Sequence, residues 1–157
     1  MHLVSVSENR QLEKRIAVTP EIAKKYIELG FELSLPKSYG LDLGFSDEDY
    51  KNLGTNIRDN ENEIISSADV IIQLGLLDDH KLSLLKENQT LIGSLDSLTN
   101  KKKLQSLKEK KINCFSLELL PRITRAQSMD ILSSQANLAG YKAVIDSFGY
   151  FKKAIPM

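Results

Sequence analysis

DVIIQLG, at residues 69–75, is the most informative stretch of this 157-residue sequence. Three consecutive β-branched residues without polar alternation are typical of a strand buried on both faces. Such strands belong to parallel sheets that helices cover, so the flanking segments are expected to be helical. The longest apolar run, residues 70–77, is broken by Gln73 and Gly75. It falls short of the roughly 20 residues that a membrane helix needs.

Outward from this strand, short apolar runs alternate with amphipathic segments in both directions. Pro20 begins one helix and Gly30 follows it, while Ser46 with Asp49 forms a capping pattern. This alternation predicts an α/β fold with a mostly parallel sheet. The expected strands are residues 3–6, 31–35, 69–75, 90–95 and 112–117; the expected helices are 21–29, 61–67, 78–85 and 100–110, with a short one opening at 46–49.

The C-terminal region differs from the rest of the chain in its residue pattern. Residues 125–153 contain no proline and carry apolar residues at helical spacing. A helix of that length would be roughly 40 Å long, more than one small domain needs. We therefore expect a helix that links this domain to another, with a neighbouring backbone or lobe packed close to Gly140.

Length and charge limit the classes of function. The chain is about one domain long, and 21 basic residues balance 21 acidic ones. This balance gives no support for binding to nucleic acid. The single cysteine, Cys114, excludes an internal disulfide and is expected to be a buried strand residue. No secretory signal is expected at the N-terminus.

Several familiar sites are missing from the sequence. His2 and His80 have no neighbouring ligands at metal-binding spacing, so no metal is expected. Lysines at 101–103, 108, 110 and 111 flank apolar helix positions and are interpreted as a solvated face. The glycine fingerprint of dinucleotide-binding domains, Gly-x-Gly-x-x-Gly, is also absent.

Residues 121–135, PRITRAQSMDILSSQ, gather polar groups where a loop enters the long helix. Arg122 lies five residues before Gln127 and eight before Asp130. Such a cluster serves either as a helix cap with surface ion pairs or as a polar site for an amide, a ribose or a phosphate. The residues alone leave both interpretations open.

Four stretches together resemble a known family: EKRIAVTP at 13–20, GFSDEDY at 44–50, ADVI at 68–71 and residues 121–141, ending SQANLAGY. They occur in order over nearly the whole chain. In them the sequence resembles the N-terminal part of the α subunits of proton-translocating NAD(P) transhydrogenases, relatives of alanine dehydrogenase.

The resemblance implies an α/β, flavodoxin-like first lobe at residues 1–124. Residues 125–157 would form the long interlobe helix and its junction with a Rossmann lobe that this chain lacks. The complete component binds NAD(H) and passes hydride from NADH to NADP⁺ on a partner component, coupled to proton translocation. The expected partners are the Rossmann lobe, the NADP(H)-binding and membrane components and a second copy of the component. The expected location is cytoplasmic, at the inner face of the inner membrane.

The resemblance also assigns roles within residues 121–135. Arg122, Asp130 and Ser133 would orient the nicotinamide end of NAD(H), and Gln127 would reach toward NADP(H) on the partner. Hydride transfer between two nicotinamides needs positioning and the exclusion of water rather than an acid or base. Arg122, Gln127 and Asp130 are therefore the candidate catalytic residues, and the isolated chain is expected to be inactive.

Two other functions stay open. Alanine dehydrogenases carry a Lys and a His for proton transfer where this chain has Gln73 and, in the second region, Leu95-Asp96. These differences disfavour amino-acid oxidation, and Arg15, their substrate-binding arginine, is interpreted here as a structural or ion-pairing residue. A non-catalytic assembly or dimerisation module is the remaining alternative.

Overall fold

The computed structural model describes residues 1–154. The chain divides into two compact units, unit 1 (residues 1–116) and unit 2 (from residue 117). Unit 1 contains the sheet and the helices that cover it, and unit 2 contains the C-terminal helix.

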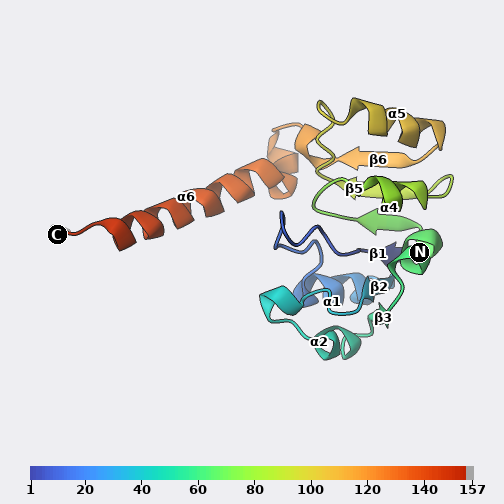
Figure 1. Ribbon diagram of the computed structural model, residues 1–157, viewed down its shortest axis with the longest axis horizontal. Helices are drawn as coiled ribbons and strands as arrows, with labels where there is room; N and C mark the ends of the chain where they lie inside the picture. The colour runs from blue at the N-terminus through green and yellow to red at the C-terminus, as the bar shows by residue number, and fades with distance from the viewer. Residues whose placement is uncertain (155–157) are drawn as a thin grey trace. The chain divides into compact units, whose positions relative to one another are not determined.

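Unit 1 is built on a six-stranded parallel sheet in the order β3-β2-β1-β4-β5-β6 (Figure 1). This confirms the predicted α/β, flavodoxin-like sheet, because the order without β3 is the 2-1-3-4-5 order of flavodoxin-type folds. β3 was not expected from the sequence: it spans three residues at the sheet edge and follows β2 after a short helix. The strands are β1 (His2–Val4), β2 (Glu32–Pro36), β3 (Asn56–Arg58), β4 (Val70–Ile72), β5 (Thr90–Gly93) and β6 (Asn113–Ser116).

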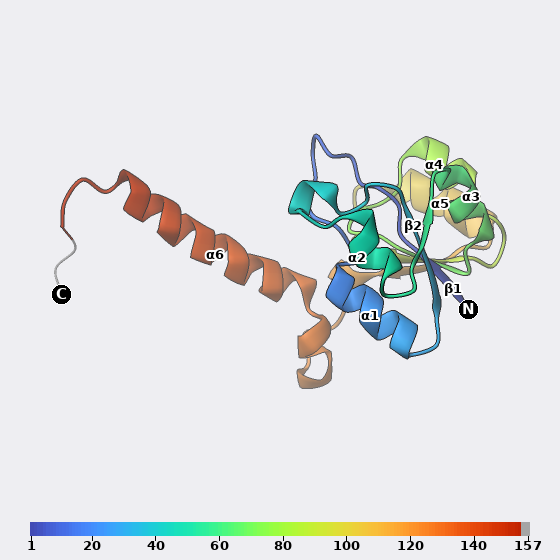
Figure 2. The same cartoon turned by 90° about the horizontal axis from the view of Figure 1, so that it is seen from below.

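Helices cover both faces of this sheet (Figure 2). Val4 and Leu3, neighbours on β1, point to opposite faces and enter two separate apolar clusters. The cluster around Val4 packs against α3, α4 and α5, and the one around Leu3 packs against α1 and α2. Burial on both faces accounts for the unbroken apolar run in β4. The helices are α1 (Pro20–Glu28), α2 (Asp47–Lys51), α3 (Glu61–Ser67), α4 (Asp79–Ser83) and α5 (Lys101–Glu109).

Local capping chemistry sets several helix boundaries. Pro20 is in the first turn of α1, and Thr19 precedes it as the N-cap. At α2, the Ser46 hydroxyl accepts a hydrogen bond from the Asp49 backbone N–H, and the Asp49 carboxylate accepts one from the Ser46 backbone N–H. This reciprocal pair confirms the capping pattern predicted from the sequence.

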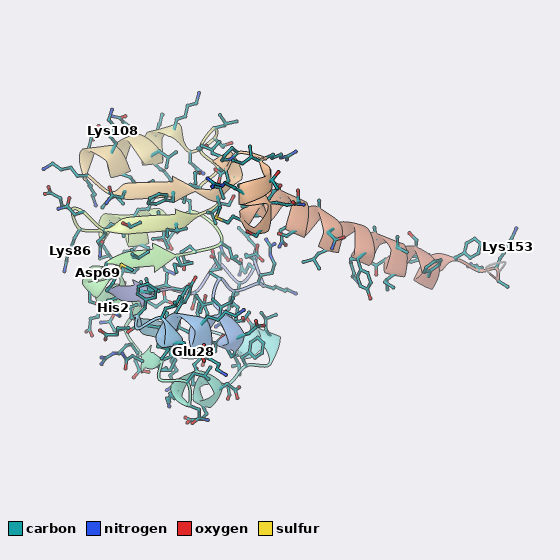
Figure 3. All side chains as sticks on the ribbon, turned by 180° about the vertical axis from the view of Figure 1, so that it is seen from behind. His2, Glu28, Asp69, Lys86, Lys108 and Lys153 are labelled. Atoms are coloured by element: carbon teal, nitrogen blue, oxygen red, sulfur yellow. The ribbon has the colours of Figure 1, made fainter. Side chains whose placement is uncertain are left out.

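His2 and Asp69 lie side by side at the amino-terminal ends of the two central strands, β1 and β4 (Figure 3). The His2 backbone N–H donates to the Asp69 carboxylate at 2.7 Å. The His2 ring nitrogens lie 3.0 Å from the Ser67 carbonyl and 2.8 Å from the Ser34 hydroxyl. His2 therefore joins β1 to its neighbours on both sides, which is a structural role.

The prediction that Cys114 is buried is wrong. The residue lies on β6, an edge strand of the sheet, and its side chain is exposed. Partial desolvation raises the pKa of the Cys114 thiol. The thiol is therefore less ionised at neutral pH than a free cysteine, and its environment does not activate it.

Unit 2 contains two 3₁₀ turns, η2 (Leu117–Leu119) and η3 (Thr124–Met129), followed by the helix α6 (Ile131–Tyr150). The predicted helix over residues 125–153 is thus too long at both ends. Asp130 has an extended backbone (φ −73°, ψ 95°) and caps α6, which separates it from η3. Twenty residues give a helix of about 30 Å rather than 40 Å.

No residue of α6 is buried in the part of the chain that the structure describes. A Cβ added at Gly140 would meet no atom within 4 Å. The neighbouring backbone expected there is therefore absent from residues 1–154, and close packing against another lobe stays a prediction. Within the same residues, no helix is long and apolar enough to cross a membrane.

Candidate functional site

All four predicted site residues lie in unit 2, around the start of α6. The Asp130 carboxylate caps the helix: its Oδ1 accepts hydrogen bonds from the backbone N–H groups of Leu132 and Ser133, both at 3.0 Å. The Ser133 hydroxyl donates to Asp130 Oδ2 at 2.6 Å. The structure therefore brings Asp130 and Ser133 together and gives them a structural role that needs no ligand.

The other two residues are not held by such bonds. Arg122 and Gln127 are exposed, and among the described residues neither side chain takes part in a hydrogen bond or ion pair. Gln127 contributes only its backbone carbonyl, which accepts from the Asp130 N–H at 3.3 Å. The guanidinium of Arg122 and the carboxamide of Gln127 thus retain their full capacity for external partners.

The electrostatics of the site favour a permanent carboxylate. Hydrogen bonds from Ser133, its hydroxyl first and its backbone N–H second, lower the pKa of Asp130, and the charge of Arg122 adds to the effect. Asp130 is therefore ionised at neutral pH and is a hydrogen-bond acceptor, not a proton donor. Arg122 donates, Gln127 donates and accepts, and Asp130 accepts, a set that can orient a planar carboxamide.

A second polar cluster lies in unit 1, at the carboxyl ends of β1 and β4. Gln73 is buried, and its carboxamide oxygen accepts from the Ser5 hydroxyl at 2.8 Å and from the Val6 backbone N–H at 2.9 Å. The Ser5 hydroxyl also lies 2.7 Å from the Tyr39 hydroxyl, which accepts from two further backbone N–H groups. Burial raises the pKa of Tyr39 to about 12, so its hydroxyl stays neutral.

This cluster bears on amino-acid oxidation. Imine chemistry requires a group that exchanges a proton near the substrate, and a carboxamide such as that of Gln73 does not titrate. Asp96 is exposed in a turn before α5, where its backbone carbonyl accepts from Thr99 and Asn100. Neither position carries the Lys or the His that is expected there in alanine dehydrogenases.

Arg15 is engaged within its own segment. Its guanidinium binds the Glu13 carboxylate through two nitrogens, at 2.9 Å and 2.6 Å. These bonds lower the pKa of Glu13 to about 2. The structure therefore shows an ion pair at Arg15, in keeping with the interpretation made from the sequence, and its role stays a prediction.

The sequence did not single out the hydrogen-bonded cluster around Gln73. A usable indication was present, because a lone glutamine in a buried strand needs internal partners. The identity of those partners, Ser5 and Tyr39, depends on strand order and could not be read from spacing. Among residues 1–154 there is no group of three His, Cys, Asp or Glu side chains able to hold a metal ion.

Comparison with known proteins assigns the family. Residues 5–139 match the family model described as "Alanine dehydrogenase/PNT, N-terminal domain". The chain belongs to this family. It is also 39% identical, over its full length, to the first part of NAD(P) transhydrogenase subunit alpha of Rhodospirillum rubrum, of which it covers 42%. The resemblance seen in the sequence is therefore confirmed.

Two further proteins, a transhydrogenase and an alanine dehydrogenase, are also similar to this chain. A solved structure of transhydrogenase from Sinorhizobium meliloti matches 98% of this chain and 46% of its own, with a TM-score of 0.88 and 34% identity. Alanine dehydrogenase 1 of Staphylococcus aureus is 26% identical over 92% of this chain and 38% of its own length. The chain thus spans less than half the length of the relatives to which it is similar.

Proposed function

We propose that this chain is the first lobe of the NAD(H)-binding component of a proton-translocating NAD(P) transhydrogenase. The observation that carries the proposal is the start of α6, where Arg122 and Gln127 are exposed and uncommitted beside an ionised Asp130. The relatives named for transhydrogenation support it, because one of them matches this chain from end to end.

The residues present suit a nicotinamide carboxamide. Asp130 Oδ1 already accepts two N–H bonds and Oδ2 one hydroxyl bond, which leaves acceptor capacity on Oδ2 for an amide N–H. Arg122 would donate to the carboxamide oxygen. Bound NADH supplies the hydride, and NADP⁺ on the partner component accepts it with its two electrons.

In this proposal the residues of the chain act by position. Arg122 and Asp130 fix the rotation of the carboxamide, and Ser133 holds the Asp130 carboxylate in place. Gln127 lies in η3, three residues before Asp130. In the proposal it reaches toward the NADP(H) bound by the partner component. No proton changes place at these groups, which agrees with the lowered pKa of Asp130. Orientation of this kind contributes much of the rate in reactions between two bound partners.

The rest of the component would lie against unit 2. The exposed apolar residues of α6 include Leu138, Tyr141, Val144, Ile145 and Phe148. Each of these five side chains is 48% to 69% exposed. Large apolar surfaces left in water often mark interaction sites, so we infer that the Rossmann lobe, or a second copy of the component, covers them. The NADP(H)-binding and membrane components would place the assembly at the cytoplasmic face of the inner membrane.

The experiment is a chimaera in which this chain replaces the matching part of the Rhodospirillum rubrum protein, mixed with that organism's NADP(H)-binding component. The assay is reduction of the acetylpyridine analogue of NADP⁺ by NADH. We expect activity from the chimaera and none from the isolated chain. A folded chimaera without activity, or an active isolated chain, would overturn the proposal.

A non-catalytic assembly module is the second candidate, and the exposed apolar surface of α6 is the observation that favours it. It predicts that substitution of Arg122 and Gln127 changes neither assembly nor activity of the chimaera. An alanine dehydrogenase activity is disfavoured by Gln73, and an assay of the chimaera with alanine and NAD⁺ tests it directly.

A further inference from the structure

The helices of unit 1 do not cover its sheet evenly. On one face, α3, α4 and α5 contribute to the apolar cluster around Val4, which reaches from β1 to β5. On the other face, α1 packs against β2 and α2 against β3 (Figure 2). Among the described residues, none from β5 or β6 belongs to the apolar cluster that α1 and α2 cover. Parallel sheets are normally covered by helices on both faces, so β5 and β6 lack a cover on this face.

Strand register shows which side chains lie at this open corner. Ile72, Ile92 and Phe115 are register partners on β4, β5 and β6, so they form one row on one face of the sheet. Ile72 packs against the cluster covered by α1 and α2, which places the row on that face. Ile92 is half-buried and Phe115 is 59% exposed, whereas Leu91, on the opposite face, is completely buried. The apolar row therefore extends beyond the helices that cover its first member.

The sheet treats its diagonally opposite corner, at β3 on the α3 side, differently. Val4, Ser34 and Asn56 are register partners, so Asn56 lies on the face to which α3 belongs. Its carboxamide donates to the Glu32 carboxylate at 3.2 Å, and Arg58, two residues farther along β3, is exposed. Charged and amide side chains of this kind are suited to water. The exposed apolar row at β5 and β6 has no such side chains.

We propose that the β5–β6 corner, formed by Ile72, Ile92 and Phe115, is the docking surface for one amphipathic helix from the part of the component that lies beyond this chain. The apolar stripe of that helix would cover the row. The source of the helix rests on the proposed function, and the length of the relatives supports it, because this chain covers 42% of the Rhodospirillum rubrum protein.

The dimensions of the corner suit a helix. Neighbouring strands lie about 4.8 Å apart, so the row from β4 to β6 spans about 10 Å, close to the diameter of a helix with its side chains. The preceding row on the same face ends in Thr90 and Asn113, which are polar but uncharged. An apolar stripe placed here would therefore bury no unpaired charge. It would extend the helical layer that α1 begins over β2.

The corner is too small for a stable dimer of this chain. A stable interface buries about 800 Å² on each partner, whereas a large aromatic side chain buries about 150–250 Å². Phe115 is already partly covered, and Ile72 and Ile92 have less exposed surface to add. A single helix needs a smaller contact area, because it would be held by the rest of the component as well.

The test is thiol labelling at position 115 in the full 157-residue chain and in the chimaera with the Rhodospirillum rubrum protein. C114S removes the native thiol, F115C places one in the corner, and the other cysteines of the chimaera are replaced by serine. We expect maleimide to react at least about tenfold more slowly in the chimaera, because the docked helix must open first. Equal rates in the two proteins would overturn the proposal.

C114S/R58C is the matched control, because it places the thiol on the opposite edge strand, at the polar corner. Its labelling should be equally fast in both proteins. Slow labelling of F115C in the isolated chain that depends on protein concentration would assign the corner to a second copy and would also overturn the proposal. The test needs a folded chimaera but not an active one, so a loss of hydride transfer is a separate result.

If F115C prevents folding of the chimaera, hydroxyl-radical footprinting of the native Phe115 provides the same comparison without a substitution. The ring should be oxidised readily in the isolated chain and protected in the chimaera. Equal oxidation of Phe115 in the two proteins would contradict the docked helix.

Discussion

Unit 1 buries two clusters of apolar residues within itself, whereas unit 2 leaves most of its apolar residues in contact with solvent. Leu33, Ile71 and Leu91 in unit 1 are completely buried, while Leu138 and Phe148 on α6 are 57% and 52% exposed. Unit 2 contains a single buried apolar residue among those described, Ala126. The first unit therefore has the core of an independent domain. The second unit exposes the apolar side chains that, under the proposed function, another part of the component covers.

The largest expected effect is a difference in stability between matched substitutions in the two units. L91A removes a buried side chain from the sheet of unit 1 and should lower the free energy of unfolding by about 2–5 kcal/mol. L138A, the matched change on exposed α6, should alter it by less than about 0.5 kcal/mol. Denaturant unfolding of both variants provides the measurement, and equal losses would contradict the distinction between the units.

The second largest effect is expected on the activity that we propose for unit 2. R122A in the chimaeric component should lower the rate of hydride transfer roughly tenfold to a thousandfold, because a positioning group is lost. Its stability should stay that of the parent, since Arg122 is exposed and makes no hydrogen bond within the described residues.

R125A is the control for R122A. Arg125 is an exposed arginine in η3, three residues after Arg122, and no catalytic role is proposed for it. Equal activities of R122A and R125A would favour the assembly-module alternative.

A smaller effect concerns the cap of α6. D130A removes the acceptor for the Leu132 and Ser133 N–H groups and should fray about one turn, or roughly four of the twenty residues. D130N should keep the helix, since asparagine also caps, but should lose the negative charge. Circular dichroism at 222 nm measures the helix content of each variant. The rate of hydride transfer in the chimaera shows whether the negative charge of Asp130 is needed for activity. Equal helicity in D130A and the wild type would contradict the capping role.

The smallest effect is an ion pair on the surface of unit 1. Because Arg15 lowers the pKa of Glu13 from 4.5 to about 2, the pair stabilises the fold above pH 4.5 and is lost as the pH falls toward 2. E13Q should therefore cost at most about 1 kcal/mol at pH 7, and progressively less as the pH falls through about 2. Unfolding curves at the two pH values check this, and a cost that grows with acid would refute it.

Most strands and helices of unit 1 were predictable from the sequence, because burial and helix capping leave recognisable residue patterns. Burial on both faces produced the apolar run of β4, and the Ser46–Asp49 capping pair fixed the start of α2. β3 was not predicted because Asn56–Arg58 contains one apolar residue between two polar ones and so shows no apolar run. The strand that contains Cys114 was predicted correctly, but its burial was not, because its place at the edge of the sheet depends on the strand order.

The site was predictable only in part. The polar run at residues 121–135 was visible, but the break at Asp130 was not, since η3 and α6 share the same helical spacing of apolar residues. The partners of Gln73 come from strands far apart in sequence, which only the sheet brings together. Roles at Arg122 and Gln127 rest on family resemblance and stay predictions.

The most direct test of the central claim is hydrogen–deuterium exchange of α6 in the isolated chain and in the chimaeric component. The account predicts fast exchange at residues 131–150 of the isolated chain and strong protection of the same amides in the chimaera, with unit 1 protected in both. Equal exchange of α6 in the two proteins would show that nothing in the larger component covers it, and would contradict the claim that this chain is one lobe of that component.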